Sequence, residues 1–188
     1  MSQEKILIVE NESIIAKDLE ISLKQLDWKV CGIAHSGIEA VEMVPRLNPD
    51  LILMDIKLGK GIDGVEAARQ ISAFSDVPIL YLTAFADKET LSRAKITNPC
   101  GYIVKPIEER NLQVTIEMGL HNHRVEKKLK EKDKWLEMIV ENLSEGLVLI
   151  DSTGRIQLMN PAAEFYSGWK KEAAVGLPFS EVLFTVNE

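Results

Sequence analysis

The chain has 188 residues, of which 46% are hydrophobic and 27% charged, and its formal net charge is −7. This balance is typical of a soluble globular protein, and the length allows one core of ordinary size plus additional structure. No run of about 18 apolar residues exists, so we expect no membrane span, and the acidic balance argues against a broad nucleic-acid surface. The N-terminus, MSQEKILIVEN, lacks the features of a signal peptide, so we expect a cytoplasmic protein.

Cysteine and histidine are sparse. Cys31 and Cys100 cannot form a disulfide framework and belong to no CxxC pair, so we interpret them as small buried side chains. His35, His121 and His123 are too few and too scattered to predict a metal site.

Short apolar runs alternate with segments of helical period over the first hundred residues. The apolar runs are Lys5–Val9, Val30–Ala34, Leu51–Met54, Ile79–Leu82 and Tyr102–Val104. The candidate helices between them are 12–26, 37–44, 63–73 and 87–96. We expect Pro45 to end or kink the second helix. Strict alternation of this kind predicts an α/β fold, a parallel sheet with helices on both faces.

Polar residues follow four of the five predicted strands. They are Glu10, Asn11 and Glu12 after the first run, Asp55 after the third, Thr83 after the fourth and Lys105 after the fifth. Because doubly wound sheets bind ligands at the carboxyl ends of their strands, we expect these side chains to converge. Carboxylates suit Mg²⁺, while an ammonium and a hydroxyl suit phosphate oxygens. Asp55 is therefore a candidate nucleophile that would form an acyl phosphate.

The segments ILIVENE, LILMDIKL, YLTAFA and GYIVKP resemble the strand-end motifs of response-regulator receiver domains of two-component signalling. The resemblance covers residues 4 to about 120 and implies a flavodoxin-like, doubly wound five-stranded sheet of order 2-1-3-4-5. It implies that Asp55 is the phosphoacceptor and that Thr83 and Lys105 contact the phosphoryl group. Tyr102 matches the switch aromatic, which moves together with Thr83.

The same resemblance implies a Mg²⁺ site and a backbone feature. The expected metal ligands are Glu10, Asn11, Asp55 and the backbone carbonyl of Lys57. The Lys105–Pro106 peptide bond is expected to be cis, a form largely confined to bonds before proline.

Asn11 departs from the family pattern, which has an aspartate that binds the metal directly. An amide oxygen can still coordinate Mg²⁺, but the pocket loses one negative charge, so we expect metal affinity to fall. Three interpretations stay open: phosphorylation with weaker metal binding, a degenerate receiver that acts by dimerisation or protein contact, and an engineered substitution. Glu12 is expected to cap the first helix instead of binding the metal.

From about Glu108 to Asn142 the sequence carries no strand signal and predicts one long helix. Leu129, Leu136 and Leu143 are seven residues apart, with Ile139 between the last two, which is the spacing of a short heptad seam. We expect this helix to pair with a partner. The alternative is a solvated connector helix that has none.

The segment EGLVLIDSTGRIQLMNPAAEFYSGWKKEAAVGLPFSEVL resembles the opening of a PAS domain and predicts strand, turn, strand and helix. The later PAS strands are missing, so we expect no ligand binding and poorly buried aromatic residues that favour association. These aromatic residues are Phe165, Tyr166, Trp169 and Phe179. The predicted divisions are a receiver at 1–122, a helical linker at 123–142 and an incomplete α+β PAS segment at 143–188.

The predicted function is a phosphorelay switch rather than an enzyme, because no kinase motif is visible. A histidine kinase would be the donor for Asp55, and the linker helix would carry the change to the PAS region. A homodimer through the face of the fourth and fifth helices, or through the linker helix, is expected. The alternative is a scaffold that acts without phosphorylation. A phosphohydrolase is disfavoured, because such enzymes carry an aspartate where this chain has Lys57.

Overall fold

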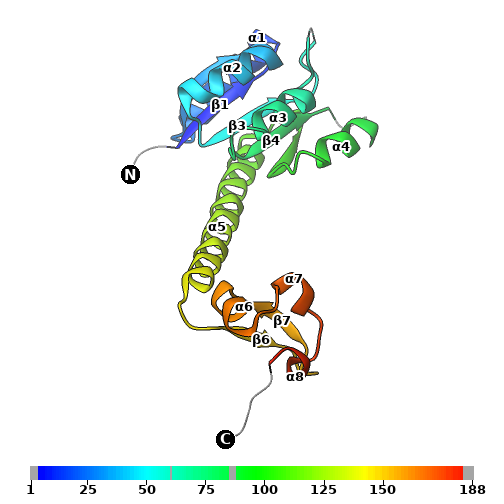
Figure 1. The fold of residues 1–188 in the computed structure, drawn as a ribbon. Coiled ribbons are helices and arrows are strands. Elements are labelled where there is room, and N and C mark those ends of the chain that lie inside the picture. Colours follow the sequence, from blue (N-terminus) through cyan, green and yellow to red (C-terminus); the bar gives the residue numbers. More distant parts are fainter. Residues whose placement is uncertain (1–3, 60, 85–87, 184–188) are drawn as a thin grey trace, which may run out of the picture. The chain divides into compact units, whose positions relative to one another are not determined.

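The structure, a computed structural model, describes residues 4–59, 61–84 and 88–183. These residues belong to two compact units, Met1–Glu126 and Lys127–Glu188 (Figure 1). Each unit is described separately below. The described helices contain no segment long and apolar enough to cross a membrane.

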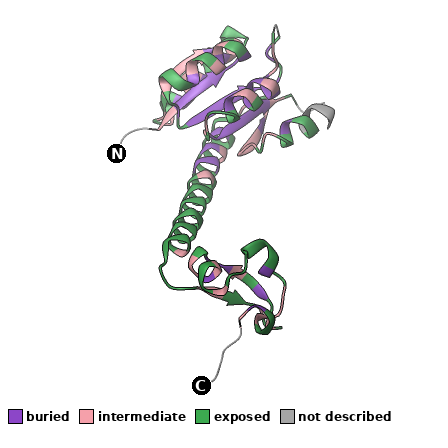
Figure 2. Cartoon of the chain, viewed as in Figure 1, coloured by how far each residue is buried: buried purple, intermediate pink, exposed green. Residues whose placement is uncertain are grey.

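The first unit is built on one parallel sheet. Its strands are β1 (Lys5–Val9), β2 (Lys29–Ala34), β3 (Leu51–Asp55), β4 (Ile79–Thr83) and β5 (Gly101–Val104). They pair in the order β2-β1-β3-β4-β5, which confirms the predicted flavodoxin-like sheet. All five residues of β3 are buried, because this strand lies at the centre and is covered on both faces (Figure 2). The unbroken apolar runs in the sequence reflect this position.

Helices cover both faces of the sheet. They are α1 (Ser13–Gln25), α2 (Gly37–Leu47), α3 (Gly64–Ser72), α4 (Lys88–Lys95) and α5 (Glu109–Asn142). Residues of α1 and α5 pack with Ile6 and Ile8 of β1 in one buried cluster. Residues of α2 and α3, with Ala94 of α4, pack with Leu7 and Val9 in another. Asp87, the first residue of the predicted fourth helix, lies outside the described residues.

The expectation that the second helix ends at Pro45 was wrong. Helix α2 continues through Pro45 and ends at Leu47, where Asn48 takes a left-handed conformation with φ of 45°. The Asn48 N–H bonds to the carbonyl of Val44 and closes the final turn. Proline lacks the N–H that would donate a helical hydrogen bond. Pro45 lies in the last turn, where only two helical residues follow it, so the missing bond disturbs little of the helix.

The second unit contains the short strands β6 (Val148–Ile150) and β7 (Ile156–Met159), which form an antiparallel pair. Three short helices follow: α6 (Pro161–Ser167), α7 (Lys171–Ala174) and α8 (Phe179–Val182). This arrangement confirms the predicted strand, turn, strand and helix. Its core is small and consists of Ile156, Met159, Ala163, Ala174 and Val182.

The prediction of poorly buried aromatic residues was correct for three side chains and wrong for one. Phe165 is 83% exposed, Tyr166 is 69% exposed and Trp169 is 37% exposed. Phe179 instead packs against the small core, because its N–H bonds to the carbonyl of Gly154 at 2.9 Å and brings α8 back onto the hairpin.

Candidate functional site: an acidic pocket at the strand ends

The predicted site residues meet at the carboxyl edge of the sheet. Asp55 ends β3, and the two neighbours of β3 are β1, which Glu10 follows, and β4, which Thr83 ends. Lys105 follows β5, and its N–H bonds to the carbonyl of Thr83 at 2.8 Å. The Lys105–Pro106 bond is cis, as predicted. We call the group of Glu10, Asn11, Asp55, Thr83 and Lys105 the acidic pocket.

Lys105 joins the two carboxylates of this pocket. Its Nζ lies 2.7 Å from Oε2 of Glu10 and 2.8 Å from Oδ2 of Asp55. Glu10 is fully buried and Asp55 is 6% exposed. Buried carboxylates are costly unless they are paired and hydrogen-bonded. The ammonium of Lys105 therefore stabilises the negative charge of the acidic pocket.

The pKa values of this ion-pair group follow from burial and pairing. Burial raises the pKa of Glu10 above its usual value, although the hydrogen bond from Lys105 acts in the opposite direction. Burial by itself would lower the pKa of Lys105, but the hydrogen bonds to Asp55 and Glu10 raise it. Lys105 is therefore a stable cation at neutral pH.

Backbone groups orient both carboxylates. The Lys57 N–H donates to Oδ1 of Asp55 at 3.1 Å, and the Glu12 N–H donates to Oε1 of Glu10 at 3.1 Å. On the far side, Nδ1 of His35 lies 3.0 Å from the carbonyl oxygen of Glu10. Sequence analysis did not predict this role for His35. Glu12 is the N-cap of α1 by position, but its side chain makes no capping hydrogen bond.

A cavity of about 220 Å³ opens beside Asp55. Its lining residues are Asn11, Glu12, Ile15, Asp55, Ile56, Lys57, Thr83, Ala84 and Lys105. A carboxylate, a hydroxyl and an ammonium therefore line one small space. Glu10 is not among the residues that line this space.

Oxygen donors around this cavity suit a hard cation such as Mg²⁺. The Asp55 carboxylate and the Asn11 side chain line it, together with residue Lys57, whose carbonyl was a predicted ligand. Among the residues that the structure describes, no group of three His, Cys, Asp or Glu side chains is assembled for a metal. Asparagine at position 11 leaves Glu10 and Asp55 as the two carboxylates of the acidic pocket.

Gly64 is a part of the site that sequence analysis missed. A Cβ on Gly64 would lie 2.0 Å from the backbone carbonyl oxygen of Asp55. The Gly64 N–H donates to the carbonyl of Ile56 at 3.0 Å. The start of α3 therefore passes directly against the strand end that carries Asp55, and only glycine fits there. A glycine just after the helix cap Asp63 was the available signal.

Aromatic residues lie next to Thr83 on the same two strands. Tyr102 of β5 pairs in register with Tyr81 of β4, and their ring centroids are 5.9 Å apart. The Tyr81 hydroxyl lies 2.9 Å from Oγ1 of Thr97, whereas the Tyr102 hydroxyl is buried without a hydrogen-bond partner in the described part of the chain. Tyr102 was a predicted switch residue, and Tyr81 was not predicted.

The second unit has its own buried polar centre at Asn160, which is 1% exposed. Its Nδ2 donates to the carbonyls of Val140 at 3.2 Å and Glu145 at 2.9 Å. Its Oδ1 accepts from the N–H groups of Leu147 at 2.8 Å and Ala163 at 2.9 Å. Asn160 thus ties the end of α5 to β6 and α6.

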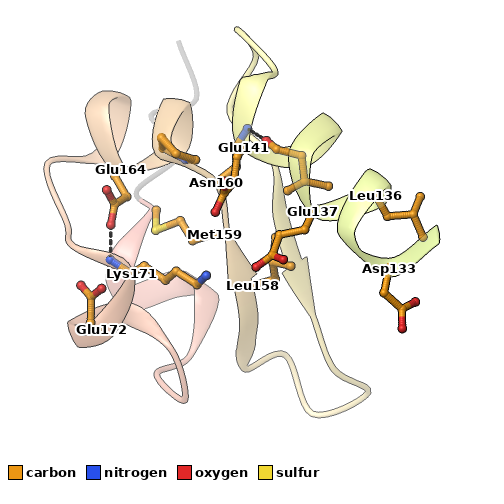
Figure 3. Close-up of a pocket in the computed structure, with 12 residues that line it drawn as sticks. Asp133, Leu136, Glu137, Glu141, Leu158, Met159, Asn160, Glu164, Lys171 and Glu172 are labelled. Atoms are coloured by element: carbon orange, nitrogen blue, oxygen red, sulfur yellow. Dashed lines mark hydrogen bonds between the residues drawn. The ribbon is translucent and has the colours of Figure 1, made fainter. Parts of the chain in front are cut away.

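A larger cavity of about 550 Å³ lies beside Asn160, between the last turns of α5 and the elements β7, α6 and α7 (Figure 3). Its apolar lining includes Leu136, Val140, Leu158 and Met159. Its acidic lining residues are Asp133, Glu137, Glu141, Glu164 and Glu172. The cavity therefore combines an apolar lining with an acidic one.

Two protein families match different parts of the chain. A family model for the response regulator receiver domain matches residues 6–117, and a model for the PAS fold matches residues 136–187. The transcriptional regulatory protein PdtaR of Mycobacterium tuberculosis is 35% identical over 120 residues, which are 64% of this chain and 58% of PdtaR. The chain thus spans less than two thirds of the length of this relative.

Solved structures show the same fold. The signal receiver domain of a modulated diguanylate cyclase from Desulfovibrio desulfuricans G20 has a TM-score of 0.64 and 40% identity, covering 66% of this chain and 99% of that one. The receiver domain of sensor histidine kinase PA1611 from Pseudomonas aeruginosa PAO1 has a TM-score of 0.59 and 30% identity, covering 64% of this chain and 99% of that one. That structure holds a magnesium ion coordinated in its active site cleft.

Proposed function

Because the chain belongs to the response-regulator receiver family, we propose that it is a phosphorelay switch that accepts a phosphoryl group on Asp55 from a histidine kinase. One observation carries this proposal: the Asp55 carboxylate faces a small cavity that Thr83 and Lys105 also line. The nucleophile and the groups that would bind phosphoryl oxygens therefore share one space.

The protein groups divide the work of transfer. An oxygen of Asp55 attacks the phosphorus atom, and the P–N bond of the phosphohistidine breaks as the new P–O bond forms, leaving the electron pair on the imidazole nitrogen. The Lys57 N–H and the Lys105 ammonium hold the carboxylate in place beforehand. Lys105 then compensates the charge of the bound phosphoryl group, to which the Thr83 hydroxyl donates a hydrogen bond.

A magnesium ion would be held by Asp55, Asn11 and the carbonyl of Lys57, with Glu10 behind them. When bound, it supplies positive charge to the phosphoryl oxygens. Because Asn11 contributes a neutral amide oxygen, we expect weaker magnesium affinity than a receiver with aspartate at this position would have.

The signal would pass from the acidic pocket to α5. A buried hydroxyl without a hydrogen bond destabilises the conformation that holds it. A second position of the Tyr102 ring, in which the hydroxyl is hydrogen-bonded, would therefore become favourable when Thr83 moves. That movement would change the face formed by α4, β5 and α5. We assign residues 1–122 to the receiver, 123–142 to the linker helix and 143–188 to the PAS segment that receives the change.

Phosphorylation with acetyl phosphate and Mg²⁺, followed by intact-protein mass spectrometry, tests this function. We expect one added phosphate on the wild-type chain, none on Asp55→Asn, and faster or more complete addition on Asn11→Asp. Absence of phosphate on the wild-type chain under conditions that modify Asn11→Asp would contradict the proposal.

That last outcome would favour the second candidate function, a scaffold that works through protein contacts without phosphorylation. The observation in its favour is Asn11 itself, which leaves the acidic pocket with two carboxylates already paired to Lys105. In this case Asp55→Asn would leave the interactions of the protein with its partners unchanged.

A further inference from the structure

Helix α5 carries a long stripe of exposed apolar side chains. In the first unit, Met118 is 59% exposed and Val125 is 52% exposed. In the second unit, the exposed members are Leu129, Leu136 and Ile139, and the exposed Leu143 follows directly after the last residue of α5. Exposed apolar stripes of this length mark interaction surfaces more often than solvated faces.

This stripe is separate from the face of α5 that packs on the sheet. The buried residues of α5 are Leu112, Ile116, Gly119 and Leu120. An α-helix turns once every 3.6 residues, so Met118 and Val125 point roughly opposite to this buried group. The helix therefore offers one apolar face to the receiver core and leaves another free.

The free stripe follows a heptad repeat. Positions a are Asn122, Leu129, Leu136 and Leu143, and positions d are Met118, Val125, Lys132 and Ile139. We propose that a second copy of this chain covers the stripe, forming a parallel, two-stranded, in-register coiled coil. This deepens the proposed function by naming the partner and the register, and it does not require phosphorylation.

The flanking charges favour the parallel orientation. In a parallel coiled coil, a g residue of one helix faces the e residue five positions later in the other. Here this pairs Lys128 with Asp133, and His121 with Glu126, across the interface. An antiparallel pair would place g beside g and e beside e, which would lose both of these pairings.

Two polar residues within the seam also point to a specific partner. Single polar residues at a or d positions specify register and oligomeric state at a cost in stability. Asn122 at a pairs with its own counterpart only when two helices are parallel and in register. Lys132 at d weakens the seam, so the pair is expected to be reversible.

The third flanking pair involves an exposed tryptophan and the cavity beside Asn160. Trp135 occupies a g position and is 60% exposed, and the matching e residue is Val140. Val140 and the seam residue Leu136 both line the 550 Å³ cavity (Figure 3). In the proposed dimer, the indole of each copy therefore lies against the apolar edge of the cavity in the other copy.

Disulfide crosslinking of the full chain tests the register. We expect Leu129→Cys and Leu136→Cys each to give a covalent dimer under mild oxidation, because equivalent a positions meet in a parallel in-register pair. Lys134→Cys, at an outward f position, is the matched control, and the unchanged chain measures the background from Cys31 and Cys100. Equal crosslinking of Lys134→Cys, or none at positions 129 and 136, would overturn the proposal.

Charge reversal and light scattering test the same arrangement independently. We expect Lys128→Glu and Asp133→Lys each to weaken the dimer and the combined variant to recover it. Lys132→Leu should tighten the dimer by roughly tenfold or more, since it adds a buried leucine from each copy. A monomeric mass for the wild-type chain and for Lys132→Leu would contradict the coiled coil.

Performing these experiments on Asp55→Asn as well separates the two proposals. The dimer should form in Asp55→Asn, which cannot be phosphorylated at that position. If the chain is phosphorylated but its cysteine variants at positions 129 and 136 do not crosslink, only the coiled-coil proposal is contradicted. If these variants crosslink but the chain is not phosphorylated, only the phosphorelay proposal is contradicted.

Discussion

Lys105 lies at the centre of the acidic pocket because it is the counterion of both Glu10 and Asp55. The Glu10 side chain is fully shielded from solvent, and that of Lys105 is only 20% exposed. Water therefore screens these ion pairs only weakly. Lys105 matters for the stability of the fold at the strand ends as well as for the proposed chemistry.

We expect Lys105→Ala to lower the free energy of unfolding by about 3 kcal/mol, because it leaves two carboxylates without their cation. The double variant Glu10→Gln/Lys105→Ala should lose less free energy of unfolding than Glu10→Gln and Lys105→Ala lose in total, because the glutamine removes one of the unpaired charges. Urea denaturation of the four proteins measures this coupling. Strictly additive losses would show that Lys105 and Glu10 do not interact in solution.

Gly64 gives a second prediction at the residue scale. We expect Gly64→Ala to lower the free energy of unfolding by at least about 2 kcal/mol, because the alanine methyl group would overlap the Asp55 carbonyl and force the backbone to move. The same shift should slow phosphorylation of Asp55. Gly61→Ala is a suitable control. Its φ is 89°, and a Cβ on Gly61 would lie 3.7 Å from Cδ1 of Ile38, an ordinary contact, so we expect only the backbone strain of about 1–2 kcal/mol.

At the scale of elements, the connection between α5 and the hairpin β6–β7 depends on hydrogen bonds more than on a large core. The core of the second unit contains five buried apolar residues. The four side-chain hydrogen bonds of Asn160 join the backbone of α5 and the following loop to the start of β6 and to α6. A signal that reaches the end of α5 would pass through this residue.

Asn160→Asp separates the two halves of this connection. The carboxylate keeps acceptors for the N–H groups of Leu147 and Ala163 but cannot donate to the carbonyls of Val140 and Glu145. We therefore expect the free energy of unfolding to fall by about 2 kcal/mol. Hydrogen exchange should show faster exchange across the second unit, while the amides of the sheet in the first unit are unchanged. Equal protection in both proteins would show that the donor bonds contribute little.

At the scale of the whole molecule, the chain consists of two units with separate cores. The receiver core contains residues of α5 only as far as Leu120, and the core of the second unit begins at Ile156. Each unit therefore buries apolar residues in its own core.

We expect a chain truncated after Glu126 to retain the thermal midpoint of the receiver and the phosphorylation of Asp55, because all of the described core contacts of the first unit remain. It should be monomeric, since it loses the seam from Leu129 to Leu143. Calorimetry and light scattering measure both properties. A large drop in the midpoint would mean that the second unit stabilises the first.

Local patterns were enough to predict most of the first unit. The five apolar runs match the strands to within one residue at each end, because strands buried on both faces must be almost wholly apolar. Asp55, Thr83 and Lys105 were predicted because parallel strands bring their carboxyl ends to one edge. The structure brings these three side chains to one cavity, and their roles in phosphoryl transfer stay predictions.

Other features depended on contacts between residues far apart in the chain. The sequence by itself determined the order of elements, the edge where polar groups gather and the substitution at Asn11. Only the tertiary structure decided that Lys105 bridges Glu10 and Asp55, that Gly64 lies against Asp55 and that Asn160 joins α5 to the hairpin. The physical reason is that periodicity records which face of an element is buried, whereas a hydrogen bond or a close approach depends on how the packed elements meet.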